Sequence, residues 1–227
     1  LAVNLPGVPV IEGVPLLPFD AALLVLDKPA GLLSVPGRGA DKQDCLSARV
    51  QAQFADALIV HRLDMATSGL MLMARGAAVQ RELSRAFASR QVQKRYIAVV
   101  DGHMQSPAEE WGEIDLPILA DWPRRPLRII DTHGQPSVTR WRVLSHEPGA
   151  DGQPQTLLEL EPVTGRTHQL RVHLQAIGHS ILGDALYASD AVRARSERLM
   201  LHASELVLQH PVSSAPLRLR SAPIWRV

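Results

Sequence analysis

The stretch HRLDMATSGLMLM, residues 61–73, decides how this sequence is interpreted. A positive side chain, a carboxylate and two hydroxyls fall within eight positions, and the chain then becomes continuously apolar, which predicts a buried strand at 69–74. Asp64 therefore precedes a buried strand, at the rim or floor of a cleft. A carboxylate placed there needs a cationic partner to offset its desolvation. A structural ion pair and a catalytic role both account for it.

The segments around this stretch predict a fold dominated by strands. Apolar or alternating runs predict strands at 22–31, 58–60, 69–74, 94–102, 127–130, 137–144, 156–163, 199–211 and 216–223. Helical spacing predicts helices at 44–54, with Asp44 as N-cap, at 80–90, and at 166–178, which ends at Gly178. This order favours an α+β fold with a mainly antiparallel sheet over a βαβ repeat.

Length and composition limit the classes of protein that the sequence can represent. The 227 residues suit one large domain or two small lobes that share a core, and we expect an N-terminal segment at 1–19 and a single domain at 20–227. The single cysteine, Cys45, argues against a disulfide framework and favours a reducing, cytoplasmic compartment. Runs of about 18 apolar residues, which would predict a membrane span, are missing.

Positive charge is segregated along the chain. Residues 60–100 hold seven basic and two acidic residues, residues 121–142 hold five arginines and two aspartates, and the charged residues of 101–120 are all acidic. Only three of the 24 basic residues are lysines. Arginine suits phosphate contacts and stacking on bases, which favours an RNA partner, although a GC-rich genome accounts for the same bias.

The sequence contains candidates for two other kinds of site, and neither is favoured. The nine histidines suggest a metal, but His168 and His173 lie five apart, about 140° around a helix, where a zinc pair needs a spacing of four. Thr67 and Ser68 are hydroxyl nucleophile candidates outside any nucleophile-elbow pattern, so hydrogen bonding to the backbone is the alternative. The histidine spacing therefore disfavours a metal site.

The predicted helix 166–178 offers cationic partners for Asp64. Its apolar stripe contains Leu170 and Leu174, Arg171 follows Leu170, and Arg166 lies in its first turn. An arginine paired with Asp64 would keep the carboxylate ionised. The residues alone leave a salt bridge and catalysis equally supported.

Four ordered blocks resemble the RluA-type pseudouridine synthase family. HRLDMATSGLMLMA at 61–74 is similar to the signature that contains the family's aspartate. The other blocks are LLVLDKPAGLLSVPG at 23–37, KRYIAVVDG at 94–102 and PVTGRTHQLRVHLQAIGHSILGDALYA at 162–188. Asp27 departs from the family, in which asparagine is common before Lys-Pro. The resemblance extends over about 20–220 and implies an α+β catalytic fold with flanking helices and a central cleft.

The resemblance also implies the reaction and the roles of several residues. The family converts uridine to pseudouridine without cofactor or metal. Asp64 would act on the ribose, Arg171 would pair with Asp64, and Tyr96 would stack on uracil and help to remove the C5 proton. Arg62 would occupy the place of the flipped uridine in the RNA stack. The remaining candidates for substrate or RNA contact, each with a structural alternative, are His61, Thr67, Arg166 and Leu174.

RNA is the partner that the resemblance implies. One subgroup has the catalytic domain without a separate S4 domain and modifies tRNA uridine 32 and 23S rRNA uridine 746, and DLPILADWPRRPLR at 115–128 is similar to it. A monomer without an obligate protein partner or a membrane is expected. Candidate phosphate contacts are Arg81, Arg85, Arg90, Arg124, Arg125 and Arg128. A non-catalytic RNA-binding protein and a metal hydrolase are the alternatives.

Overall fold

A computed structural model describes residues 11–17, 20–107 and 109–225, and they form two compact units. Unit 1 comprises residues 1–92 and 205–222, and unit 2 comprises residues 93–204 and 223–227. The single domain expected at 20–227 stays a prediction. Part of the expected N-terminal segment is integral to unit 1, because Ile11 and Val14 are buried in its core and Leu17 N donates to Val25 O at 2.8 Å. Residues 1–10, 18 and 19 of that segment lie outside the described residues.

Unit 1 is built around an apolar strand, β3. Its elements are β1 (Leu23–Lys28), a 3₁₀ turn (Ala40–Lys42), α1 (Leu46–Gln51), β2 (Ala57–Ile59), β3 (Ser68–Arg75), α2 (Ala77–Ala88), the second half of β10 (Leu201–Gln209) and β11 (Pro216–Arg220). The strand order is β1–β3–β10, with β2 also on β3 and β11 on β10. The predicted strands at 22–31, 58–60, 69–74 and 216–223 are confirmed.

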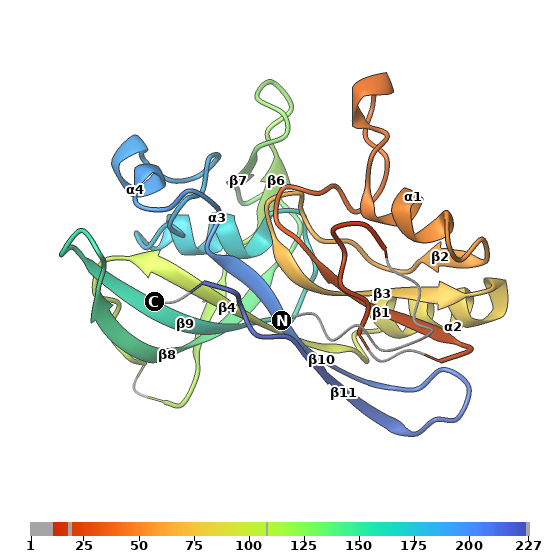
Figure 1. Cartoon of the computed structure of the whole chain (residues 1–227). Coiled ribbons are helices and arrows are strands. Elements are labelled where there is room, and N and C mark those ends of the chain that lie inside the picture. Colours follow the sequence, from red (N-terminus) through yellow and green to blue (C-terminus); the bar gives the residue numbers. More distant parts are fainter. Residues whose placement is uncertain (1–10, 18–19, 108, 226–227) are drawn as a thin grey trace. The chain divides into compact units, whose positions relative to one another are not determined.

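Side chains of β3 alternate between two hydrophobic clusters. Met71 and Met73 pack with Leu46 of α1, whereas Leu70 and Leu72 pack with Leu83 of α2. Because successive strand residues point to opposite faces, this alternation places the two helices on opposite sides of the strand (Figure 1). The continuous apolar run therefore reflects burial on both faces.

One local prediction for α1 is wrong. Asp44 was expected to cap this helix, but the N-cap is Cys45, whose side chain makes no capping hydrogen bond. The Asp44 carboxylate instead accepts from Arg49 Nε at 2.7 Å and Nη2 at 2.6 Å. An arginine one turn along the helix competes successfully for a carboxylate that would otherwise bond the backbone.

Unit 2 is an antiparallel sheet with α3 as its main helix. Its elements are β4 (Gln93–Asp101), β5 (Gly112–Asp115), β6 (Ile118–Ala120), β7 (Arg128–Ile130), β8 (Val138–Pro148), β9 (Pro154–Pro162), α3 (Gln169–Ala176), α4 (Asp190–Ala194) and the first half of β10. The strand order is β10–β4–β9–β8–β5, and β6 and β7 form a separate hairpin. The predicted half-buried strands are confirmed for β9, where Leu158 and Leu160 are buried and Glu159 and Glu161 are not.

The amphipathic character expected for α3 is wrong. The six residues Gln169–Leu174 are all buried, so the helix is enclosed on its polar side as well as on its apolar side. Segments that precede the helix in sequence supply the polar partners: Gln169 Nε2 donates to Val138 O at 2.9 Å, and His173 Nε2 lies 2.9 Å from Leu116 O. Gly178 follows the helix with a φ of 86°, in agreement with the predicted stop.

Candidate active site

Asp64 lies in a loop of unit 1 whose backbone is fixed on both sides of the carboxylate. On the preceding side, the Ser34 hydroxyl donates to Leu63 O at 2.7 Å and accepts from Leu63 N at 3.1 Å. On the following side, Gly31 N donates to Met65 O at 2.8 Å, and a φ of 85° at Gly31 suits glycine. The half-buried Asp64 side chain is thus carried on a preorganised segment.

Lys28 provides the second support for this loop. Its side chain is fully buried, and its ammonium donates to Pro29 O at 2.9 Å, Leu32 O at 2.8 Å and Met65 O at 3.1 Å. A buried lysine is rare, and hydrogen bonds to carbonyl oxygens offset the desolvation of its ammonium. The cation therefore joins the end of β1 to the residue that follows Asp64.

The remaining site residues predicted for unit 1 surround Asp64 in the same loop. His61 Nε2 accepts from Leu72 N at 2.9 Å and its ring stacks on Phe87 with centroids 4.4 Å apart, so this nitrogen carries no proton. Thr67 N donates to Asp64 O at 3.1 Å, which closes a turn. Arg62 is exposed. These contacts give His61 and Thr67 supporting positions and leave Arg62 accessible to a ligand.

Arg171 has a carboxylate partner that was not anticipated from the sequence. Its Nε lies 2.8 Å from Asp184 Oδ2 and its Nη2 lies 2.6 Å from Asp184 Oδ1, and both side chains are buried in unit 2. The carboxylate also accepts from Leu186 N at 2.8 Å and from Tyr187 N at 3.1 Å. A bidentate pair of this kind fixes the plane of the guanidinium. The predicted pairing of Arg171 with Asp64 stays a prediction.

Tyr187 connects Arg171 to two further segments of unit 2. The Arg171 guanidinium carbon lies 5.1 Å from the Tyr187 ring centroid. The Tyr187 hydroxyl lies 2.6 Å from His168 Nδ1 and accepts from Arg128 N at 2.9 Å. His168, immediately before α3, has a φ of 58°, which is uncommon for a non-glycine residue. This conformation presents its ring to Tyr187.

The other residues predicted for unit 2 occupy β4 and α3 or the chain before it. Tyr96 lies half-buried on β4 opposite Leu160 of β9. Leu174 is fully buried, so its contribution to the core is certain whatever else it contacts. Arg166 precedes α3, and its backbone N donates to Gln169 Oε1 at 3.0 Å. It therefore supports the entry to the helix instead of forming its first turn.

Comparison with known proteins establishes the family. The family model described as RNA pseudouridylate synthase matches residues 22–176, more than half of the chain. The chain belongs to the RNA pseudouridylate synthase family. The resemblance to RluA-type members is thereby confirmed, and the protein is an RNA pseudouridine synthase, an isomerase that modifies RNA.

Curated relatives and solved structures agree with this assignment. The synthase is 48% identical over 195 residues to "Dual-specificity RNA pseudouridine synthase RluA" of Vibrio parahaemolyticus, covering 86% of this chain and 77% of that protein. It is 47% identical over 193 residues to the protein of the same name from Escherichia coli K12, covering 85% of each. The solved structure "Human RNA Pseudouridylate Synthase Domain Containing 1" matches with a TM-score of 0.77 and 30% identity over 95% of this chain and 85% of that chain.

Sequence reasoning missed four residues of the synthase that support the site. Lys28 and Ser34 lie in the block at 23–37, and Asp184 and Tyr187 lie in the block at 162–188. Each block was noticed as a pattern without roles for these positions. A lysine at the end of an apolar strand was the one local signal, because a buried ammonium must find acceptors.

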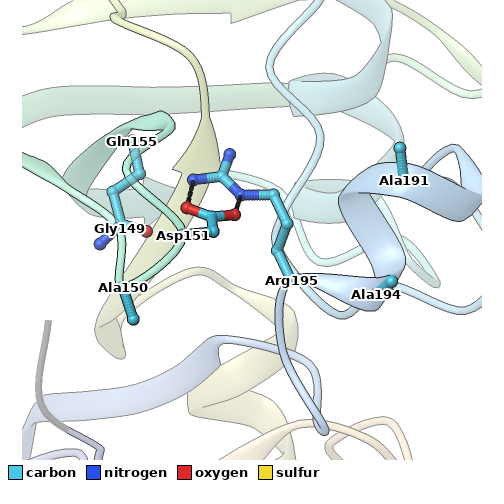
Figure 2. A pocket seen from close by; sticks show the side chains of 7 residues that line it. All are labelled: Gly149, Ala150, Asp151, Gln155, Ala191, Ala194 and Arg195. Carbon is cyan, nitrogen blue, oxygen red and sulfur yellow. Dashed lines mark hydrogen bonds and ion pairs between the residues drawn. The ribbon is translucent and has the colours of Figure 1, made fainter.

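A pocket of about 380 Å³ in unit 2 is separate from these residues. Arg195 crosses it and donates to the Asp151 carboxylate with its Nε at 2.7 Å (Figure 2). The same guanidinium also contacts Asp101 and Gln153 O, so the positive charge of the arginine in this pocket is balanced by carboxylates. The pocket is lined by Gly149, Ala150, Asp151, Gln155, Ala191, Ala194 and Arg195. Arg195, at the end of α4, thereby joins this helix to the β8–β9 turn.

Two further properties concern the described residues of the synthase. Within 11–17, 20–107 and 109–225, His, Cys, Asp and Glu side chains do not gather in threes in any arrangement that could hold a metal ion. Across the same part of the chain, every helix is too short or too polar to cross a membrane.

Proposed function

We propose that Asp64 is the catalytic group with which this synthase converts uridine to pseudouridine in structured RNA. The observation that carries the proposal is the double support of its loop: Ser34 holds Leu63, and Lys28 holds Met65. A catalytic carboxylate must be held close to its productive position, and supports on both neighbours restrict its movement. In the reaction, the N1–C1′ bond breaks and a C5–C1′ bond forms, while the C5 proton leaves and N1 is protonated.

The other predicted residues take the roles that the family resemblance implies. Arg171, whose plane is fixed by Asp184, pairs with Asp64 and orients its carboxylate. Tyr96 stacks on the uracil and assists removal of the C5 proton. Arg62, which is exposed, replaces the flipped uridine in the RNA stack.

We further propose that the substrates are tRNA uridine 32 and 23S rRNA uridine 746. The printed name of the relatives, which specifies dual specificity for RNA, supports two substrates. His61, Thr67, Arg166 and Leu174 support or line the site. We also propose that the enzyme acts in the cytoplasm, as a monomer and without a protein partner.

The decisive experiment measures pseudouridine formation in unmodified tRNA and 23S rRNA hairpin transcripts in the presence of EDTA. The wild type should modify one uridine in each RNA, and Asp64→Asn should abolish the reaction while its unfolding curve is unchanged. Asp41→Asn, at an exposed position of unit 1, is the matched control and should retain full activity.

Three results would count against the proposal. Full activity of Asp64→Asn would exclude its catalytic role, and a need for zinc in the chemical step would favour metal-dependent chemistry. Tight RNA binding by the wild type without pseudouridine in any cellular RNA would instead identify a non-catalytic RNA-binding protein.

A further inference from the structure

The loop between β6 and β7 exposes a tryptophan. Trp122 is 65% exposed, although tryptophan has one of the largest apolar surfaces of any side chain. Figure 1 shows the β6–β7 hairpin rising beside α3, within unit 2, with its loop projecting beyond the helix. Trp122 lies in this loop, between the end of β6 and the start of β7, and most of its ring surface is available to a ligand.

The loop that carries Trp122 is held in one conformation. The Asp121 side chain is buried and accepts from Arg124 Nε at 2.7 Å. Backbone bonds run from Asp121 N to Leu127 O at 3.1 Å and from Leu127 N to Arg124 O at 3.0 Å. The exposure of Trp122 is therefore a property of an ordered loop, and a ligand would meet the ring without first ordering it.

The ring already has a cation against it. The Arg125 guanidinium carbon lies 4.4 Å from the Trp122 ring centroid, and Arg125 Nε donates to Trp122 O at 3.3 Å. The Arg124 side chain, although paired with Asp121, remains 70% exposed. Residues 121–128 hold three arginines and one aspartate. A tryptophan combined with excess positive charge matches a ligand that presents flat bases along a phosphate backbone.

The base of the hairpin is connected to the residues proposed for catalysis. Arg128 N, at the start of β7, donates to the Tyr187 hydroxyl at 2.9 Å, and the Tyr187 ring lies against Arg171. The Tyr187 hydroxyl also meets His168, the residue that precedes α3. RNA held at the loop is thus held in a fixed relation to Arg171.

We propose that Trp122 and Arg125 form a platform on which one unpaired base of the RNA substrate stacks, a base other than the uridine that is modified. Arg124 contacts a phosphate next to that base. The platform rests on the proposed function, because it positions the RNA for the reaction at Asp64. It acts in binding and takes no part in the chemical step.

Steady-state kinetics of four enzymes on a tRNA stem-loop test the platform. Trp122→Ala should raise KM about 5- to 150-fold, the fold-change that corresponds to about 1–3 kcal/mol for one stacked base, with kcat unchanged. Trp122→Phe should recover most of the affinity because it keeps an aromatic face. Trp122→Leu, which is apolar without that face, should behave like the alanine variant. Thermal unfolding should be the same for all, because the side chain is exposed.

A double-mutant cycle identifies the base. Each unpaired nucleotide of the stem-loop, apart from the target, is replaced in turn by an abasic residue, and Kd is measured with wild type and Trp122→Ala. At one position the abasic RNA should bind the wild type weakly and lose nothing further with the variant. That RNA should also fail to quench the part of the tryptophan fluorescence that Trp122→Phe removes.

The possible outcomes separate the platform from the proposed function. A wild type that makes no pseudouridine contradicts the proposed function, and the Kd cycle still judges the platform. An active wild type with an unchanged KM in Trp122→Ala overturns the platform. Rescue by leucine equal to that by phenylalanine, or the absence of any coupled nucleotide, also overturns it.

Discussion

At the scale of single residues, the support of Asp64 depends on one hydroxyl. The Ser34 hydroxyl satisfies both backbone polar groups of Leu63, whose side chain is only 5% exposed. Removing a partner from buried polar groups costs more free energy than the mean strength of a hydrogen bond suggests. The proposed catalytic carboxylate is therefore sensitive to a residue that touches neither substrate nor Asp64 itself.

Ser34→Ala tests this support. We expect the free energy of unfolding to fall by about 1–3 kcal/mol, because Leu63 N–H and C=O lose their partner, and kcat to fall with little change in KM. Urea denaturation and steady-state kinetics measure the two effects. Ser106→Ala, at an exposed position, is the control and should change neither. An unchanged kcat in a destabilised Ser34→Ala would show that the clamp is not needed for the reaction.

Arg62→Ala tests the stack-filling role of an exposed arginine. Turnover should fall more on a folded stem-loop than on an RNA whose target uridine is already unstacked, because the second substrate needs no help in flipping. The ratio of kcat/KM on the two RNAs is the measurement. An equal loss on both RNAs argues for a simple phosphate contact.

Asp184→Asn tests the buried pair with Arg171. Loss of the carboxylate leaves a buried guanidinium without its charged partner, so we expect a destabilisation of about 3–5 kcal/mol in urea denaturation. Replacing both residues by leucine should restore much of the stability without activity. Asp44→Asn, which breaks the exposed pair with Arg49, is the control and should have a small effect.

At the scale of elements, α3 shows which features can be predicted from the sequence and which cannot. The spacing of Leu170 and Leu174 and the stop at Gly178 predicted the helix and its end. The spacing could not predict that Gln169 and His173 are buried, because their partners on Val138 and Leu116 lie about 30 and 57 residues earlier. Burial of polar residues depends on what packs against them.

Among the other elements, some were also predicted from the sequence and some were missed. The alternation or continuity of apolar residues predicted most strands, including β3 and β9. Strands β5 and β6 and helix α4 were missed: each is short, and none stood out as an apolar run in the way that the short strands β2 and β7 did. Of the site, the residue pattern indicated Asp64 and Arg171 as candidates, and the resemblance added their roles. The supports Ser34 and Asp184 appear only when the chain is folded.

The buried His173 of α3 makes the stability of the folded protein depend on pH. Burial holds the pKa of His173 below its ordinary value of 6.5, and Thr139 and Leu116 occupy both ring nitrogens of the neutral form. The unfolded chain therefore binds a proton near pH 6.5 that the folded chain resists. This share of the stability is present above pH 6.5 and is lost as the pH falls toward the lower folded pKa.

His173→Gln should consequently be less stable than wild type at pH 7.5 but lose less stability between pH 7.5 and 5.5. Urea denaturation across this range measures the slope of the unfolding free energy against pH. His133→Gln, at an exposed position, should keep the slope that His173 contributes. Parallel slopes for wild type and His173→Gln would assign the acid sensitivity to other groups.

At the scale of the whole molecule, the segregation of charge predicts strong salt dependence of RNA binding. Each phosphate contact contributes about 0.7–0.9 to the slope of log affinity against log salt. We expect the combined Arg81, Arg85 and Arg90 to alanine variant to lower this slope by about 1, since fewer than half of these arginines should touch RNA. Arg218→Ala, on β11 beside Glu205, is the control. An unchanged slope would place the RNA on other arginines.

The division of β10 between the two units has a consequence for synthesis of the protein. Unit 1 takes the second half of β10 into its sheet beside β3, and Leu206 and Leu208 complete the hydrophobic cluster that contains Leu70 and Leu72. Residues 201–209 leave the ribosome long after β3, by on the order of ten seconds at ordinary translation rates. Until then the nascent chain exposes an apolar strand edge. Because unit 2 also needs its part of β10, the strand pairing of both units is completed only after residues 201–209 have been made.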